Sequence, residues 1–223
     1  MKNNYIILIL FFHFFGCSII DKEYNIDDLY EKDEFFTKEK YTDEGVSGRL
    51  YRLYGGDKIY LGYLNNGKKD GLYTDWWENG NKMEEGEYES GTTIGKYFSW
   101  YENGNVQREQ FFNKNGEPKG IHKSFRENGT IQSEWNYIKG MKYLYHPNGK
   151  IMVESSIDGN GFTTWYWDNG NIQMAYSETN DIKNFHVSYR YDGSKDFYTS
   201  YKDDGTEDYT VCYDLYNNII PCN

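Results

Sequence analysis

The chain has 223 residues, of which 19% are aromatic and 26% charged, and its formal net charge is -11. This acidity and the lack of a Lys/Arg cluster argue against a nucleic-acid partner. A mean hydropathy of -0.90 argues against an apolar helical core, and the abundance of Tyr, Phe and Trp favours half-buried strands.

The first residues predict export. Residues 1–4 form a short basic start, and residues 5–16 form an apolar run that is shorter than the about 20 residues a bilayer-spanning helix needs. We therefore expect a signal peptide at residues 1–16. Its end, Phe14-Phe15-Gly16-Cys17, resembles a bacterial lipobox, which implies a lipid on Cys17 and a membrane-anchored protein of the bacterial cell envelope. An uncleaved anchor and ordinary cleavage are the alternatives.

Residues 17–44 are dense in charge and are predicted to form a lipidated tether, with a short helix as one option. Four apolar side chains in this segment allow a second arrangement, in which they dock on the first hairpin. The sequence leaves this choice open. The four are Leu29, Tyr30, Phe35 and Phe36.

An ordered region is expected to begin near Gly45 with a β-hairpin. Residues 49–54 and 58–63 are rich in Tyr, Leu and Ile, and Gly55-Gly56 between them is a turn signal.

A repeat follows. Trp76-Trp77-Glu78-Asn79-Gly80 recurs at residues 100–104 and 125–129, with weaker copies at 145–149, 166–170, 191–193 and 201–205. From Gly80 to Gly193 the glycines lie 24, 25, 20, 21 and 23 residues apart, so one unit averages about 23 residues. The glycines predicted to form these turns are Gly80, Gly104, Gly129, Gly149, Gly170, Gly193 and Gly205.

Each unit is expected to be two strands. A second glycine series, from Gly67 to Gly159, falls about halfway between the first, which leaves room for one strand of about six residues and a turn. Asn-Gly favours a type I′ turn, because Gly adopts positive φ freely and Asn tolerates it. Frequent glycines also disfavour helix. We therefore predict an all-β fold, an elongated antiparallel β-meander of repeated hairpins over residues 45–210.

The last residues, 211–223, are predicted to form a hairpin that caps the array. A three-residue loop, Tyr216-Asn217-Asn218, would place Leu215 opposite Ile219 and Cys212 opposite Cys222. Directly opposed strand residues are within disulfide reach, so an oxidising envelope compartment favours a Cys212–Cys222 bond. Two free thiols are the alternative.

The spacing of aromatic and glycine positions resembles the bacterial variant of the MORN repeat. The motif aromatic-aromatic-x-Asn-Gly at Trp76 and again at Trp100 carries the resemblance, with Tyr88, Gly91 and Gly95 at the expected places between them. The similarity extends over about residues 65 to 205 and is greatest to the YwqK-like family of antitoxins. It implies a non-enzymatic protein that binds a protein partner, such as a toxin.

Conventional sites for chemistry are not expected. His122, His146 and His186 lie in different repeats, without a cysteine or second histidine at metal-ligand spacing, and are interpreted as surface or turn residues. The carboxylates before each Asn-Gly recur as part of the repeat, which favours a scaffold role over acid–base catalysis. We predict no catalytic residues, no metal and no cofactor.

Paired aromatic rings are the candidates for partner binding. Neighbouring residues of a strand point to opposite faces, so if the sheet has no second layer, one ring of each pair forms an exposed stripe. Cross-strand packing that stiffens the array is the alternative. The candidates are Trp76, Trp77, Trp100, Tyr101, Phe125, Tyr145, Tyr166 and Trp167.

The expected function is that of a lipid-anchored protein–protein interaction module, with toxin neutralisation by occlusive binding as its specific role. The alternative is a structural or glycan-binding envelope lipoprotein. A hydrolase that uses dispersed carboxylates is a third option, supported only by their abundance.

Overall fold

The computed structural model describes residues 22–222. The signal peptide predicted at residues 1–16 and the lipid predicted on Cys17 lie outside the described residues.

The described part of the chain contains strands and one 3-10 helix, η1 (Ile26–Asp28), and no α-helix. The strands are β1 (Glu23–Asn25), β2 (Tyr30–Lys32), β3 (Phe35–Thr37), β4 (Gly48–Tyr54), β5 (Asp57–Asn65), β6 (Lys68–Lys69), β7 (Gly71–Trp76), β8 (Lys82–Glu89), β9 (Thr92–Trp100), β10 (Val106–Phe112), β11 (Ile121–Phe125), β12 (Ile131–Asn136), β13 (Met141–Tyr145), β14 (Ile151–Ser156), β15 (Gly161–Tyr166), β16 (Ile172–Thr179), β17 (Ile182–Tyr189), β18 (Lys195–Tyr201), β19 (Glu207–Tyr213) and β20 (Ile219–Ile220).

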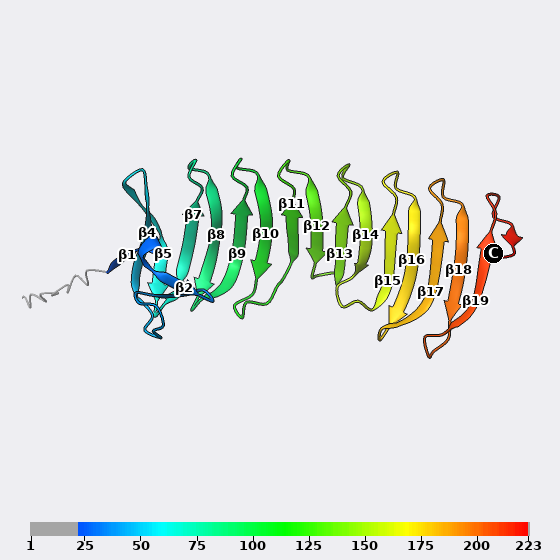
Figure 1. Cartoon of the computed structure of the whole chain (residues 1–223), viewed down its shortest axis with the longest axis horizontal. Helices are drawn as coiled ribbons and strands as arrows, with labels where there is room; N and C mark the ends of the chain where they lie inside the picture. Colours follow the sequence, from blue (N-terminus) through cyan, green and yellow to red (C-terminus); the bar gives the residue numbers. More distant parts are fainter. Residues whose placement is uncertain (1–21, 223) are drawn as a thin grey trace, which may run out of the picture.

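Strands β7 to β20 form one 14-stranded sheet in which each strand pairs with its neighbours in sequence. The sheet is an antiparallel meander, as predicted, and Figure 1 shows it as one long row of strands from β7 to the red C-terminal end. At a strand spacing of about 4.8 Å, its 13 steps between strands span about 60 Å. The array begins later than predicted, because β4, β5 and β6 belong to a separate four-stranded sheet with β1.

The described part of the predicted tether folds against this smaller sheet, which corrects the tether prediction for residues 22–44. β1 pairs in parallel with β4, and β2 pairs with β3. The side chain of Phe36 is 2% exposed, and Leu29 packs against the same cluster. Burial of these apolar groups outweighs the charge of the surrounding sequence. The docking arrangement that the sequence left open is therefore the one found for these two side chains.

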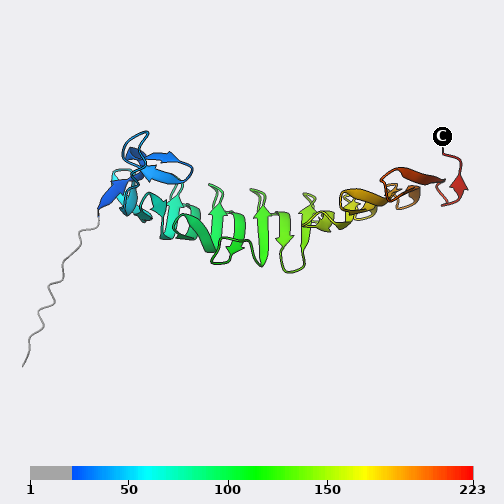
Figure 2. The same ribbon diagram turned by 90° about the horizontal axis from the view of Figure 1, so that it is seen from below.

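The main hydrophobic core lies in the N-terminal lobe, which we define as residues 22–76. Its buried side chains include Phe36, Leu50 and Leu64, each fully enclosed, together with Leu61 and Tyr73. Beyond β9 the sheet is a single layer, and Figure 2 shows the blue N-terminal segment over one end of the sheet only. The array must therefore be stabilised by contacts within the sheet.

A buried carboxylate joins the two sheets. Asp75 of β7 is 2% exposed, and its two oxygens lie 2.7 and 2.8 Å from Nη1 of Arg52 in β4. Tyr54 Oη donates to Asp75 Oδ1 at 3.0 Å. Burial alone would lower the pKa of Arg52, but Tyr54 and Asp75 outweigh it and raise that pKa above its ordinary value. The small sheet and the 14-stranded sheet are thus linked by a satisfied ion pair.

The Asn-Gly turns at one edge of the array are not of the predicted type I′. At Asn79-Gly80 the Trp77 carbonyl accepts from Gly80 N and Trp77 N donates to Asn81 O, so the loop has three residues. Only the glycine has positive φ, and this is the type I turn followed by a left-handed residue. Type I′ turns occur at the opposite edge, as at Ser90-Gly91, where both φ values are positive. Six of the seven predicted turn glycines lie at the same edge as Gly80, with φ from 82° to 94°, and we call it the Asn-Gly edge. Gly205, with φ 81°, lies at the opposite edge, because its turn joins β18 to β19.

The C-terminal hairpin differs from its predicted register. Cys212 lies opposite Ile220, and Tyr213 lies opposite Ile219, so the predicted pairing of Cys212 with Cys222 across the strands is wrong. The loop has the predicted length of three residues but is shifted by one residue, to Leu215-Tyr216-Asn217, because Asp214 N donates to Asn218 O. Asp214 Oδ1 accepts from the backbone N–H groups of Tyr216 and Asn218.

Candidate interaction surface

The predicted partner-binding rings lie at the ends of strands beside the Asn-Gly edge. All eight are half-buried, and none belongs to the exposed large hydrophobic residues of the described chain. Trp77, Trp100 and Tyr101 come together around an open hollow of about 370 Å³. The expected exposed stripe is therefore not formed by these rings.

The second residue of each motif holds consecutive repeats together. Its side chain donates a hydrogen bond to the backbone carbonyl of the first motif residue in the next repeat, and we call this series the donor row. Ring size is not what the position requires, since arginine and histidine fill it as well as Trp and Tyr. The contacts are Trp77 Nε1 to Trp100 O (3.0 Å), Tyr101 Oη to Phe125 O (2.8 Å), Arg126 Nη2 to Tyr145 O (2.5 Å), His146 Nε2 to Tyr166 O (2.9 Å), Trp167 Nε1 to Tyr189 O (3.4 Å) and Arg190 Nη2 to Tyr213 O (2.6 Å).

The motif asparagines also act between repeats. Asn79 Oδ1 accepts from Asn81 N at 2.9 Å, which closes its own turn, while Asn79 Nδ2 donates to Glu102 O of the next turn at 2.7 Å. Asn103 and Asn169 repeat this double contact. Asparagine is therefore used for its amide as well as for turn formation, since aspartate could form only the first of these bonds.

One face of the first half of the array carries regularly spaced carboxylates. Register places Glu85, Glu109, Glu134 and Glu154 on every second strand of one face, with Phe98, Lys123 and Tyr143 on the strands between them. We call these four the carboxylate row. Glu154 accepts from Tyr166 Oη at 2.8 Å, and burial together with this carboxylate raises the pKa of Tyr166 to about 12.

The same face of the second half carries aromatic rings in mutual contact. Phe162 of β15 lies 5.9 Å from Phe185 of β17, centroid to centroid. Phe185 lies 6.1 Å from Tyr198 of β18, and Tyr198 lies 6.1 Å from Tyr209 of β19. Phe162 and Tyr209, at the ends of this aromatic ladder, are 66% and 51% exposed.

Sequence reasoning missed the aromatic ladder because its members lie outside the Asn-Gly motif. Phe162 and Tyr209 stand near the far ends of their strands, and their neighbourhood depends on register. Register places Phe162 opposite Ser177, Ser177 opposite Phe185, Phe185 opposite Ser200 and Ser200 opposite Tyr209. Aromatic residues within each of these strands were the available signal, but they do not say which strands align.

Two histidines contradict their interpretation as surface or turn residues. His122 of β11 is 6% exposed, and its Nε2 lies 2.7 Å from Phe111 O, where the pairing of β10 with β11 stops. His186 of β17 packs edge-on against Phe197. Burial, assisted by Lys183, lowers the pKa of His186. Both histidines fill space on the face opposite the ladder, so they serve the packing of the sheet.

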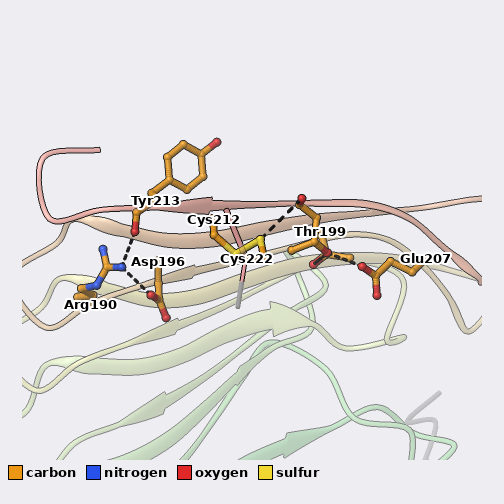
Figure 3. Close-up of a disulfide and its surroundings, with 8 residues drawn as sticks. Arg190, Asp196, Thr199, Glu207, Cys212, Tyr213 and Cys222 are labelled. Atoms are coloured by element: carbon orange, nitrogen blue, oxygen red, sulfur yellow. Dashed lines mark hydrogen bonds and ion pairs between the residues drawn. A yellow bond between two sulfur atoms is a disulfide. The ribbon is translucent and has the colours of Figure 1, made fainter. Parts of the chain in front are cut away.

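The C-terminal end is held by a disulfide and an arginine (Figure 3). Cys212 of β19 and Cys222 are bonded, with 5.3 Å between their Cα atoms, although they are not opposed in the ladder. Arg190 Nη2 donates to Asp196 Oδ1 at 2.8 Å as well as to Tyr213 O. The last strand is only two residues long and is followed by Pro221, which cannot donate a hydrogen bond to a further strand.

Residues 69–90, 94–114 and 118–139 each match the family model described as MORN repeat variant. Such repeats are commonly protein- or membrane-interaction modules. The same hairpin geometry continues beyond the matched segments as far as Tyr213. No curated protein matches the chain.

Two further features concern the described residues alone. None of their helices has the length and apolar character needed to cross a bilayer. They also contain no group of three or more His, Cys, Asp or Glu side chains arranged to hold a metal ion.

Proposed function

We propose that this protein is a non-enzymatic, lipid-anchored interaction module of the bacterial cell envelope, and that it neutralises a toxin by occlusive binding. The observation that carries the proposal is the single-layer sheet, which offers an extended face with an exposed aromatic ladder at one end and a carboxylate row at the other. The matching repeat class supports an interaction module. The resemblance of the sequence motifs to YwqK-like antitoxins is the ground for proposing a toxin as the partner.

The architecture suits binding better than catalysis. Each hairpin contacts mainly its neighbours, and the donor row fixes one repeat to the next, so the sheet presents its side chains on a stiff support. With a lipid on Cys17, the described fold would begin within a few residues of the membrane. The distal hairpins would then extend about 60 Å along the array.

Photo-crosslinking in the native cell tests the interaction. A crosslinking amino acid is placed singly at exposed positions on both faces, for example at Phe162 and at Trp135, which is 38% exposed on the opposite face. We expect one protein to crosslink from one face, and the purified pair to bind with the same face dependence. If that protein is a toxin, co-expression of this chain should restore growth. Absence of any protein adduct from either face would refute the proposal.

The lipid anchor has its own test. Replacement Cys17→Ser should move the protein from the membrane to the soluble fraction and abolish incorporation of labelled fatty acid. Cys212→Ser serves as the matched control, because it changes a cysteine within the described fold. Unchanged membrane association of C17S would exclude this mode of anchoring.

The aromatic ladder also favours the alternative, a glycan-binding envelope lipoprotein, because exposed rings in a line can stack on sugars. Pull-down with soluble envelope polysaccharides distinguishes the two functions. The glycan-binding function would be supported if the wild-type protein binds the polysaccharide, the variant F162S/Y209S does not, and no protein crosslink is found.

A further inference from the structure

The ladder end of the array is an uncharged surface within an acidic chain. In β15 to β19, two rows of side chains share the face of the ladder, and none of their positions carries a charge. These positions are Phe162, Thr164, Ala175, Ser177, Phe185, Val187, Tyr198, Ser200, Tyr209 and Val211.

Exposure and ring contacts set this surface apart from the rest of the sheet. Its rings touch in series from β15 to β19, and the end rings, Phe162 and Tyr209, expose more than half of their surface. Fixed aromatic rings lose little conformational entropy on binding and dominate the energy of protein interfaces. The ladder therefore has the character of an interface centre.

The charge changes abruptly where the ladder begins. Glu134 in β12 and Glu154 in β14 occupy the same row of this face as Ala175 in β16, so the carboxylate row ends at the strand before the ladder. Within the described residues, neither Glu109 nor Glu134 forms an ion pair. Lys123 lies between them in the row, but neither carboxylate is held in an ion pair with it, so both can accept a contact from a partner.

We infer that this face docks a polypeptide whose contact surface has an apolar centre and a basic flank. The apolar centre covers Phe162, Phe185, Tyr198 and Tyr209, and the basic flank lies over Glu109, Glu134 and Glu154. This inference rests on the proposed interaction function and specifies the partner's chemistry and the face that it uses.

Charge complementarity selects a basic polypeptide over other occupants. A neutral glycan could stack on the rings but would gain nothing from the carboxylate row. An anionic membrane surface would be repelled by the row and by the net charge of -11. A polypeptide with Lys or Arg beside apolar residues satisfies both parts of the face, and the carboxylates would also accelerate its association.

Defined peptides test the inference on the purified full chain. The probe peptide has a Phe-rich half and a Lys-rich half; one control replaces its lysines with Glu, and another replaces its phenylalanines with Ser. Binding is followed by fluorescence anisotropy at low and high salt. We expect the Phe–Lys peptide to bind more tightly than either control, and its affinity to fall as salt rises.

Variants assign the two halves of the site. F162S/Y209S, which alters exposed rings, should weaken binding of the Phe–Lys peptide at least about tenfold. E109Q/E134Q should weaken it less and reduce its salt dependence. W135S on the opposite face is the matched control and should bind like wild type. Circular dichroism verifies that each variant remains folded.

Three results would overturn the inference: equal binding of the Phe–Lys and Phe–Glu peptides, wild-type affinity of F162S/Y209S, or binding of a soluble neutral glucan at the ladder without peptide binding. These outcomes are separable from failure of the proposed function. A protein partner that crosslinks only from the Trp135 face would leave the interaction module intact and refute this docking site.

Discussion

The N-terminal lobe and the repeat array hold together by different means. In the lobe, Phe36, Leu50 and Leu64 are enclosed between the small sheet and the segment that precedes it. In the array the central residues of many strands are buried only by their neighbours in a single layer, and several of them are polar, such as Ser99 and Thr199. The lobe is stabilised mainly by apolar burial, whereas the array depends on hydrogen bonds and ring contacts between consecutive hairpins.

The comparison shows how an array can grow without a core. A donor in the second motif position recurs from Trp77 to Arg190, and the motif asparagine adds an amide contact in four of the units, so most added hairpins bring their own connections. Only the ends need special protection. The lobe covers the first end, while the disulfide and Arg190 close the other.

The largest expected effect on stability comes from a substitution in the core of the lobe. Leu50→Ala removes a side chain with 0% exposure and should lower the free energy of unfolding by about 4 kcal/mol, because the surrounding core cannot fill the cavity. Val153→Ala in the array is the matched substitution and should cost about half of that. In hydrogen exchange measured under increasing denaturant, Leu50→Ala should reduce the protection of amides in the lobe. Val153→Ala should reduce it in the central hairpins. Equal costs would contradict the proposed difference.

The next effect concerns the distal end. Reduction of Cys212–Cys222, or the pair of substitutions to Ser, should destabilise the terminal hairpin by about 3 kcal/mol, since the bond closes a loop of sequence separation 10. Backbone amides of β19 and β20 should exchange faster, while those of β4 and β5 remain protected. Faster exchange throughout the chain would show that the cap controls the whole array.

A smaller loss of stability is expected when a hydrogen bond of the donor row is removed. Trp77→Phe removes the hydrogen bond to Trp100 O and should cost about 1 kcal/mol. Trp165→Phe is the matched control, because Trp165 Nε1 is buried and has no hydrogen-bond partner among the described residues. It should leave stability unchanged or raise it. If both variants behave alike in thermal unfolding, the donor row does not stabilise the array.

The smallest effect is a pH dependence confined to the C-terminal half. Burial lowers the pKa of His186 from its ordinary value of 6.5, so the unfolded chain binds more protons just below pH 6.5. Stability of β16 to β18 should therefore be complete above this pH and decrease as the pH falls through the interval between the unfolded and folded pKa values. His186→Gln should flatten this step in urea unfolding, whereas the lobe should show none of it.

The turn carboxylates act in a separate interval. Hydrogen bonds from Ser194 and Thr206 lower the pKa values of Asp192 and Asp204 from their ordinary 3.8. Their contribution is present above that pH and is lost only as the pH falls through the lowered values. A titration between pH 7 and 5 thus reports His186 without them. A step that persists in H186Q would assign it to another group.

Local chemistry made much of the array predictable. The two glycine series and the strand-forming residues between them predicted a hairpin meander, and the first hairpin was placed within about two residues at its ends. Turn type was less accessible, since Asn-Gly serves both a type I′ turn and the three-residue loop found at Gly80. The contact from the asparagine amide to the next turn could not be predicted, because it joins two hairpins and the pattern within one hairpin does not indicate it.

The sequence predicted the type of residue at the candidate surface but not which residues form it. Aromatic residues were expected to bind a partner, but the motif rings Trp77, Tyr101 and Trp167 are engaged in contacts between repeats. In the aromatic ladder the end rings, Phe162 and Tyr209, are exposed instead. Their assembly depends on strands from different hairpins being in register, which a residue pattern within one strand cannot specify.

The sequence by itself determined the class of fold, the repeat length and the positions of the turns, because strand alternation and glycine turns act over a few neighbouring residues. Tertiary structure alone decided that Phe36 enters the core, that Cys212 lies opposite Ile220 in the last hairpin, and that the carboxylate row gives way to the aromatic ladder on one face. Each of these depends on the relative position of segments far apart in the chain, where burial and register outweigh local preference.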